Sequence, residues 1–401
     1  MSRITEQPNN RRTVEPSNRI TEQSDNLITI QPSNRRTAVF NCDNDLALAN
    51  FSPGFTPPSH IRMMMEELSG LPSAWEAALP SSQADGVSVW GWSPAVCHRL
   101  RQMGVDEALL PSPSQLQEIR RLSSRERAVE LLAQMRQEGV CADYQSVYCT
   151  DEAQVEAALL RWPRTILKAP WSGSGKGLRY GQGGREDTLR GWYQRIIQQQ
   201  GGVVVEPLYN KVHDLAMEFW SDGQGHVTYQ GLSLFETHPN GAYSGNLLMP
   251  ESEKEAWLHQ FVSPQHVLAV RQWLEQHLGQ LIGTAYRGYL GVDMMLTAPP
   301  TPEGEKFCHK ASNERPALVD EVQKAVLHPM VEVNLRMTMG MVSILLQRLQ
   351  PEGFRGVFRL DYFPEPEAME RDNAMRQSTS STFRILASGP HYRAYIQSVE
   401  G

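Results

Sequence analysis

The chain has 401 residues, a formal net charge of −7 and 40% hydrophobic residues. This length predicts two or three domains rather than one core, and the acidic balance argues against a protein that coats nucleic acid through a basic surface. No apolar run approaches the roughly 18–20 residues that a membrane-spanning helix needs. The polar N-terminal region also lacks the apolar core of a signal peptide.

The cysteines are scattered, with no C-x-x-C pair among them: Cys42, Cys97, Cys141, Cys149 and Cys308. That spacing favours reduced thiols over a disulfide framework or a zinc site. Together with the composition, it predicts a soluble, cytoplasmic, multidomain protein.

Residues 1–37 are almost wholly polar and partly repeat themselves. The sequence RITEQ at 3–7 returns at 19–23, and PNNRRT at 8–13 returns as PSNRRT at 32–37. Such a segment buries too little apolar surface to offset the entropy lost on ordering. We therefore expect a disordered tail with no assigned chemistry.

The next segment alternates strand and helix patterns, at 38–42, 59–67, 86–92 and 95–103. Ser93 is a candidate N-cap, with Pro94 at the first helical position. This alternation predicts a small α/β domain with a parallel sheet over residues 38–120. Within it, residues 111–113 (PSP) are typical of a linker.

An acidic cluster, Asp43-Asn44-Asp45, follows the first of these strands. Side chains at the carboxyl end of a strand in an α/β sheet are placed to contact a ligand. A solvated turn is the alternative, and the sequence slightly favours the turn.

The rest of the chain contains several longer patterns. Apolar residues at helical spacing predict helices at 123–138, 189–199, 264–282 and 339–349. Apolar or alternating runs predict strands at 165–168, 202–206, 214–220, 227–235, 288–296 and 330–334. Residues 236–249 are polar and contain glycine, which predicts a loop, and residues 351–401 are expected to form a small β-rich extension.

The most informative stretch is residues 165–180, TILKAPWSGSGKGLRY. An apolar run ends in Lys168, and a loop of small residues follows: Ser172, Gly173, Ser174, Gly175, Lys176 and Gly177. Glycines let several backbone N–H groups turn toward one point, which suits phosphate oxygens. With two lysines as countercharge, the stretch predicts binding of a nucleoside triphosphate. A basic hairpin turn on the surface is the alternative.

Two common phosphate motifs are excluded. In a P-loop, the lysine is followed by Ser or Thr, but Lys176 is followed by Gly177. The glycines are spaced two by two, so they do not form G-x-G-x-x-G either. A lysine on a strand followed by a glycine flap instead resembles the ATP-grasp superfamily.

Acidic residues on two later strands provide a second indication. Asp293 lies in an otherwise apolar strand, and residues 332–336 (EVNLR) place Glu332, Asn334 and Arg336 on one face of a strand. Burying a carboxylate without a partner costs free energy, so such residues are expected to bind something. Mg²⁺ prefers oxygen ligands of this kind. Arg336 could bind a phosphoryl group or an oxyanion. An amphipathic edge strand is the alternative.

The order of these features resembles the ATP-grasp layout over about residues 123–349. The resemblance implies an α/β and α+β multidomain protein, with a pre-ATP-grasp α/β domain at 38–120. An ATP-grasp domain at 121–350 would follow, with lobes at about 121–206 and 207–350.

The resemblance also implies roles for the phosphate and metal residues. Lys168 would contact the α- and β-phosphates, the loop at 172–177 would fold over the β- and γ-phosphates, and Arg125 would add a phosphate-binding cation. Magnesium, or manganese in its place, would be held by Asp293, Glu332 and Asn334. Arg336 and Lys168 are the candidate catalytic residues.

The implied nucleoside contacts lie on and after the strand at 202–206. Glu206 would orient the adenine amino group, the carbonyl of Pro207 and the N–H of Tyr209 would read the base, and Asp214 would hold the ribose hydroxyls. Pro207 has no N–H, so it can supply only the carbonyl.

The resemblance implies a ligase that activates a carboxylate as an acyl phosphate and joins it to an amine. Substrate candidates are Arg287 and the residues His238, Gly241, Tyr243, Ser244, Gly245 and Asn246. A small-molecule or peptide substrate is expected, with no nucleic acid and no membrane, and a homodimer is the expected assembly. An ATP-grasp kinase and a non-catalytic nucleotide-binding module remain as alternatives.

Overall fold

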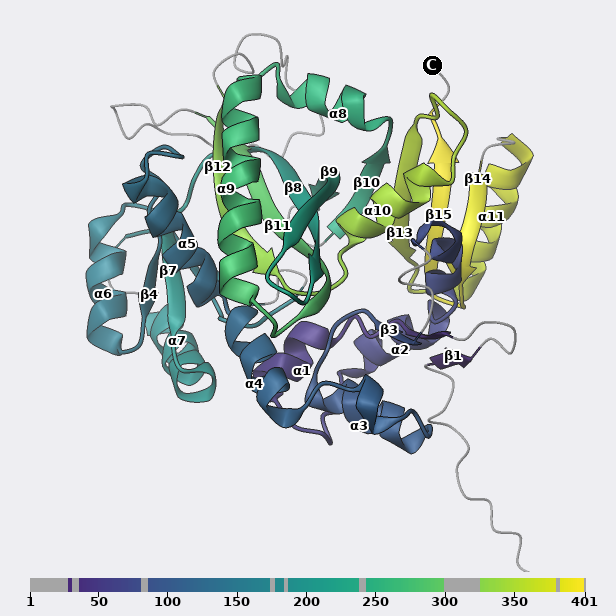
Figure 1. The fold of residues 1–401 in the computed structure, drawn as a ribbon, viewed down its shortest axis with the longest axis horizontal. Helices are drawn as coiled ribbons and strands as arrows, with labels where there is room; N and C mark the ends of the chain where they lie inside the picture. Colours follow the sequence, from purple (N-terminus) through teal and green to yellow (C-terminus); the bar gives the residue numbers. More distant parts are fainter. Residues whose placement is uncertain are drawn as a thin grey trace, which may run out of the picture.

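The computed structural model describes residues 28–30, 36–80, 86–173, 177–183, 187–237, 243–298, 325–379 and 383–399. These residues form three sheets with helices packed around them (Figure 1). In the described part of the chain, no helix is long and apolar enough to cross a membrane.

The N-terminal sheet has three strands. β2 (Arg36–Val39) pairs in parallel with β3 (Gly86–Val89), which confirms the predicted parallel pair. β1 (Ile28–Ile30) pairs antiparallel with β2, although residues 1–37 were expected to be disordered. The run Ile-Thr-Ile is rich in β-branched residues, which favour strands.

Four helices accompany this sheet: α1 (Asn44–Asn50), α2 (Ser59–Glu67), α3 (Pro94–Gln102) and α4 (Pro113–Leu122). The predicted start of α3 is confirmed, since Ser93 accepts a hydrogen bond from the Val96 N–H. The predicted linker at 111–113 is observed only in part, since residues 111 and 112 lie outside any helix or strand. Ser112 and Gln115 form a capping box there, and Pro113 is the first residue of α4.

The second sheet is antiparallel, with the order β4-β7-β5-β6. Its strands are β4 (Val147–Cys149), β5 (Thr165–Lys168), β6 (Leu178–Gly181) and β7 (Val203–Pro207). Helices α6 (Glu152–Arg161) and α7 (Asp187–Gln200) bury one face against Leu167, Val203 and Val205. Because side chains alternate along a strand, Lys168 and Glu206 point to the opposite face.

The large sheet is antiparallel and has the order β12-β11-β8-β9-β10-β13-β15-β14. Its first five strands in the chain are β8 (Lys211–Asp222), β9 (Val227–Thr237), β10 (Tyr243–Leu248), β11 (Arg287–Thr297) and β12 (Val326–Asn334). The other three are β13 (Gly356–Tyr362), β14 (Phe383–Ser388) and β15 (Tyr392–Ser398).

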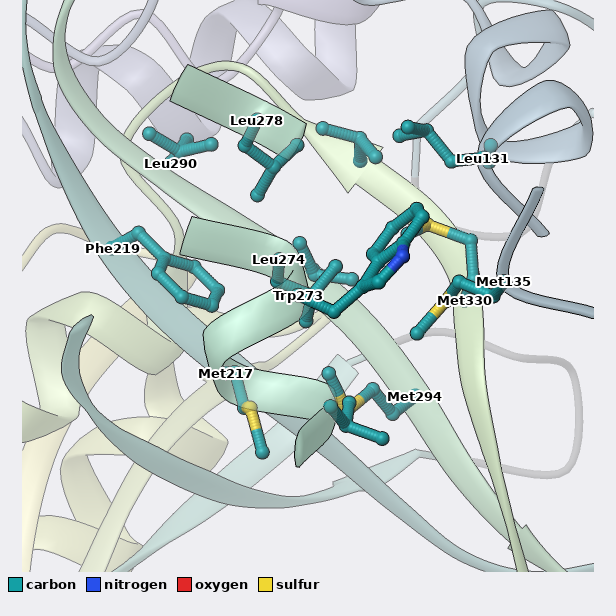
Figure 2. Close-up of a cluster of buried hydrophobic side chains, with 14 of the residues drawn as sticks. Leu131, Met135, Met217, Phe219, Trp273, Leu274, Leu278, Leu290, Met294 and Met330 are labelled. Carbon is teal, nitrogen blue, oxygen red and sulfur yellow. The ribbon is translucent and has the colours of Figure 1, made fainter. Parts of the chain in front are cut away.

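Helices cover both faces of the large sheet. On one face, α5 (Arg125–Gln137) and α9 (Pro264–Ile282) bury a cluster that includes Met135, Trp273 and Phe219 (Figure 2). α10 (Met339–Arg348) packs against Leu248 and Phe358 in a second cluster. The remaining helices are α8 (Glu251–Leu258) and α11 (Pro366–Thr379).

One prediction about the later chain is wrong, and another is confirmed only in part. Part of the expected loop at 236–249 forms the end of β9 and the strand β10, because β13 pairs with β10 from more than 100 residues further along. Residues 351–401 were expected to form a small β-rich extension, and three strands are observed there. These strands continue the large sheet, and helix α11 packs beside them (Figure 1).

Candidate functional site

The predicted metal ligands lie together on two neighbouring strands. Asp293 on β11 is opposite Glu332 on β12, and Gly291 is opposite Asn334, so the three oxygen-bearing side chains share one face. Burial and the nearby charge of Glu332 raise the pKa of Asp293. Among the described residues, no three His, Cys, Asp or Glu side chains gather at metal-binding distance. Two carboxylates and one amide still fit Mg²⁺, which completes its shell with waters and phosphate oxygens.

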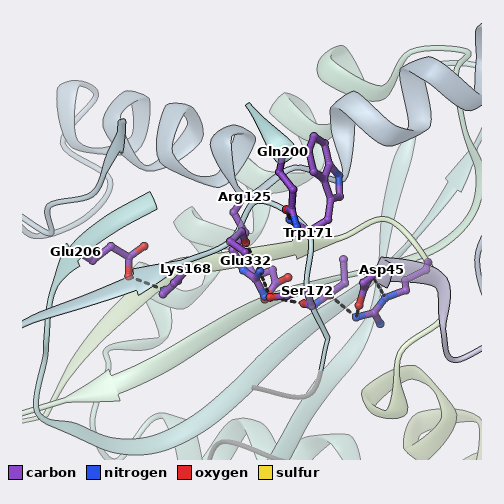
Figure 3. A network of polar contacts seen from close by, with 11 residues as sticks. Asp45, Arg125, Lys168, Trp171, Ser172, Gln200, Glu206 and Glu332 are labelled. Carbon is purple, nitrogen blue, oxygen red and sulfur yellow. Dashed lines mark hydrogen bonds and ion pairs between the residues drawn. The ribbon is translucent and has the colours of Figure 1, made fainter. Parts of the chain in front are cut away.

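Arg336 is held by a residue from the N-terminal domain. Its Nε and Nη2 donate to the two carboxylate oxygens of Asp45, at 2.9 and 2.8 Å, and Nη2 also donates to Asn334 Oδ1 at 2.8 Å (Figure 3). The predicted solvated turn at 43–45 is therefore wrong. Asp43 and Asn44 are buried, and Asp45 is ion-paired within the candidate site.

Arg125, the first residue of α5, connects the glycine loop to the metal ligands. Its Nη1 donates to Ala169 O at 2.6 Å and to Ser172 Oγ at 2.7 Å. Its Nη2 donates to Ser172 O at 3.0 Å and to Glu332 Oε2 at 2.8 Å (Figure 3). Its predicted phosphate contact stays a prediction, while the visible role of this buried guanidinium is to join the two sheets.

Lys168 and Glu206 form an ion pair on the inner face of the small sheet, with Nζ and Oε2 2.5 Å apart (Figure 3). Both side chains are buried, and Ser146 Oγ donates to the second carboxylate oxygen at 3.0 Å. A buried lysine and carboxylate satisfy each other in this geometry. A phosphate group would compete with Glu206 for the Lys168 ammonium group.

The described part of the glycine loop is tightly closed at its base. The N–H of Ala169 donates to Gly177 O at 2.9 Å, and a Cβ at Gly177 would overlap the Ser172 side chain. This close approach explains the need for glycine at 177. Gly173 lies beside Asp45, and Ser174, Gly175 and Lys176 lie outside the described residues.

The predicted nucleoside contacts extend from the end of β7 in the small sheet to β8 in the large sheet. Pro207 ends β7, and the Tyr209 hydroxyl is bound to the backbone of Gln145, accepting from its N–H at 2.6 Å. Asp214 Oδ2 accepts hydrogen bonds from Lys211 Nζ at 2.5 Å and Thr237 Oγ1 at 2.9 Å. The base and ribose contacts of these residues stay predictions.

Glu218, on β8, was missed by the sequence reasoning. It is 1% exposed, and Oε2 has no hydrogen-bond partner among the described residues. Burial, with a smaller contribution from Asp293, raises its pKa to about 8. A signal was present in the sequence, since Asp214, Ala216 and Glu218 alternate along one strand and so share a face.

The predicted substrate residues are only partly brought together. The Tyr243 hydroxyl donates to Asn246 Oδ1 at 2.6 Å, and Asn246 Nδ2 donates to Ser233 Oγ at 2.7 Å. Ser244 Oγ accepts from Arg359 instead. Gly245 lies on β10, and His238 and Gly241 lie outside the described residues.

Arg287 does not join this group. It is exposed at the start of β11, with its guanidinium over the Trp220 ring. Six residues of strand separate it from Asp293, which is roughly 20 Å at the usual rise. Arg287 is thus distant from the predicted metal ligands, and its pairing with a substrate carboxylate stays a prediction.

No protein-family model matches the chain, and neither does any curated protein. Solved structures similar to it include N5-carboxyaminoimidazole synthetase from Staphylococcus aureus complexed with ADP (12% identity, TM-score 0.43, 81% of this chain and 89% of that chain). Biotin carboxylase from Campylobacter jejuni has 12% identity and a TM-score of 0.45 over 92% and 88% of the two chains. D-alanyl-alanine synthetase A from Vibrio cholerae has 13% identity and a TM-score of 0.39 over 67% and 73%. Similarities with such low sequence identities and TM-scores give no information about the reaction of this chain.

The architecture of the chain agrees with the fold class that the sequence predicts. A small antiparallel sheet presents the strand lysine and the glycine loop, and a large antiparallel sheet presents Asp293 and residues 332–336. An α/β unit with a parallel strand pair precedes both. This arrangement is the one that the resemblance to the ATP-grasp superfamily implies.

Proposed function

We propose that the protein is an ATP- and Mg²⁺-dependent ligase that activates a carboxylate and joins it to an amine. The observation that carries this proposal is the position of Arg125, which contacts the base of the glycine loop and Glu332 at once. The phosphate-binding elements of one sheet thereby adjoin the carboxylates of the other. Such positioning of charged groups is the main requirement of phosphoryl transfer.

In the proposed reaction, a carboxylate oxygen of the substrate attacks the γ-phosphorus of ATP, and ADP leaves. An amine then attacks the acyl carbon of the acyl phosphate, and inorganic phosphate leaves as the nitrogen loses a proton. Lys168 binds the phosphates once its ammonium group exchanges Glu206 for them. Arg336, fixed by Asp45, faces the developing negative charge.

Asp293, Glu332 and Asn334 would hold the magnesium ion, which supplies charge neutralisation for the phosphate oxygens. Glu206, Pro207, Tyr209 and Asp214 would bind the nucleoside. The proposed substrate is a small molecule or a peptide, because the net charge of −7 argues against nucleic acid as a partner.

The direct test measures ADP release with Mg²⁺ and ATP across pools of amino acids and short peptides, with hydroxylamine as the surrogate nucleophile. A ligase forms a hydroxamate from the activated acid. ADP release with a stable phosphorylated product and no hydroxamate would favour the kinase alternative. ATP binding without turnover in every pool would favour the non-catalytic module.

A further inference from the structure

His328 is a buried histidine that no predicted role uses. It lies on β12, four residues before Glu332, and the strand register places it beside Met295, which lies beside Asp214. Met295 is two residues after Asp293, so His328 faces the same side of the sheet as the predicted metal ligands. The register of β12 shifts between His328 and Glu332, and the nearby Leu327 and Met330 belong to the buried hydrophobic core.

Two tyrosines hold the imidazole ring in place. The Tyr144 ring lies 4.1 Å from it, centroid to centroid, and the Tyr209 ring packs against it edge to face at 5.4 Å. Both hydroxyls form hydrogen bonds to other groups. The Tyr144 hydroxyl pairs with Thr297 Oγ1 at 2.7 Å, and the Tyr209 hydroxyl pairs with the Gln145 backbone. The His328 side chain therefore has little freedom to turn, and only 1% of the residue is exposed.

The hydrogen bonds of the ring determine which nitrogen carries the proton. Nδ1 accepts a long hydrogen bond of 3.4 Å from the Met330 N–H, so it carries no proton. Burial, with the nearby charge of Lys168, lowers the pKa of His328 to about 3, and the ring is neutral at physiological pH. The single proton then lies on Nε2.

This Nε2–H donor has no acceptor among the described residues. A buried donor without an acceptor is costly, and such groups in folded proteins usually have a ligand, ion or water as partner. The position of Nε2 indicates which of these partners it has. Tyr209, a predicted base-reading residue, contacts the ring, and Lys168 is close enough to affect its pKa. A partner here lies where the nucleoside end of the proposed ATP site would be.

We propose that His328 Nε2–H donates a hydrogen bond to a ring nitrogen of the bound nucleobase. This inference rests on the proposed function, because it requires a nucleotide between Lys168, Glu206 and the large sheet. A donor cannot pair with the exocyclic amino group of adenine, whereas each unprotonated ring nitrogen is an acceptor. His328 is then a specificity-determining residue that favours purines with an acceptor at that position.

The test measures the dissociation constants of Mg·ADP and its 1-deaza, 3-deaza and 7-deaza analogues by calorimetry, which needs no knowledge of the substrate. Each analogue replaces one ring nitrogen with C–H. Wild-type protein should lose about three- to tenfold in affinity for one analogue, the value of one neutral hydrogen bond. His328→Leu should bind ADP more weakly by a similar factor and should no longer discriminate against that analogue.

Two further variants distinguish the loss of the N–H donor from a general disturbance of the fold. His328→Gln keeps an N–H donor in a similar position and should retain most of the discrimination. His213→Leu makes the same change on β8, where the ring packs against Trp257 and Phe261, and should leave nucleotide binding unchanged.

The outcomes also separate this inference from the function on which it rests. If wild-type protein binds ADP but His328→Leu shows unchanged affinity and unchanged discrimination, a water satisfies Nε2 and the inference is wrong alone. If folded wild-type protein does not bind Mg·ADP at all, the proposed function and the inference are both wrong.

Discussion

Asp45 and Arg336 form a two-pronged ion pair across 291 positions of sequence, with Nη2 and Oδ2 2.8 Å apart. Asp45 belongs to the first turn of α1 in the N-terminal domain, and Arg336 follows β12 of the large sheet. Both side chains are more than four-fifths buried. Helix α1 therefore fixes the arginine that the proposed mechanism places beside the reacting phosphate.

Removing one member of this pair should destabilise the fold. Asp45→Asn leaves the buried Arg336 charge without its partner, and we expect a loss of about 1–3 kcal/mol in the free energy of unfolding. Glu107→Gln, which breaks an exposed Glu–Arg pair, should leave the free energy of unfolding nearly unchanged. Urea denaturation measures both, and equal effects would contradict the assigned importance of Asp45.

Lys168→Ala should weaken Mg·ATP binding by more than about tenfold, because it removes a charge paired with phosphate. The change also leaves Glu206 buried without its cation, so affinity must be measured well below the melting temperature. Arg101→Ala removes a cation from an exposed pair and serves as the control. Unchanged ATP affinity in folded Lys168→Ala would contradict the nucleotide site.

Glu218 should make stability depend on pH. Its folded-state pKa is raised from the ordinary 4.5 to about 8, so the folded protein holds a proton that the unfolded chain releases in this range. The free energy of unfolding then falls as pH rises from about 4.5 to 8. Glu218→Gln removes this ionisation, so its stability relative to wild type should increase from pH 5 to pH 8. Melting curves with EDTA measure the difference, and a constant difference would contradict the raised pKa.

Two glycine-to-alanine substitutions in helices should change the free energy of unfolding in opposite directions. A Cβ at Gly340, in α10, would overlap Glu218 Oε1 and crowd Ser233, so Gly340→Ala should cost about 1–3 kcal/mol. A Cβ at Gly191, in α7, would meet no atom within 4 Å, and Gly191→Ala should stabilise by about 0.5–1 kcal/mol. Thermal unfolding tests both, and destabilisation by both would mean that the Gly340 effect is not specific to Glu218.

Local patterns predicted much of the fold. The helix at 264–282 is observed with the same bounds, and the predicted antiparallel strands at 214–220 and 227–235 lie within β8 and β9. The alternation of Glu332 and Asn334 on one strand face is also confirmed. These features depend on residues close in sequence, where the spacing of apolar side chains is informative.

Contacts between distant segments could not be predicted in this way. Asp45 and Arg336 are joined only by the tertiary fold, and so are Arg125 and Glu332, which are 207 positions apart. β10 seemed to be a loop because its partner β13 lies far along the chain. Periodicity within one segment carries no information about which distant segment will pair with it.

The most direct test of the central claim is hydroxamate formation with ATP, Mg²⁺, hydroxylamine and pools of amino acids and short peptides. Wild-type protein should form a hydroxamate and a matching amount of ADP. Glu332→Gln should form neither, because it removes the charge of a proposed metal ligand while keeping an oxygen for Arg125. Glu126→Gln, also on the Arg125 helix, is the matched control and should keep full activity. Hydroxamate formation at a wild-type rate by Glu332→Gln would contradict the proposed metal site. ATP binding without any turnover in wild type would contradict the proposed ligase.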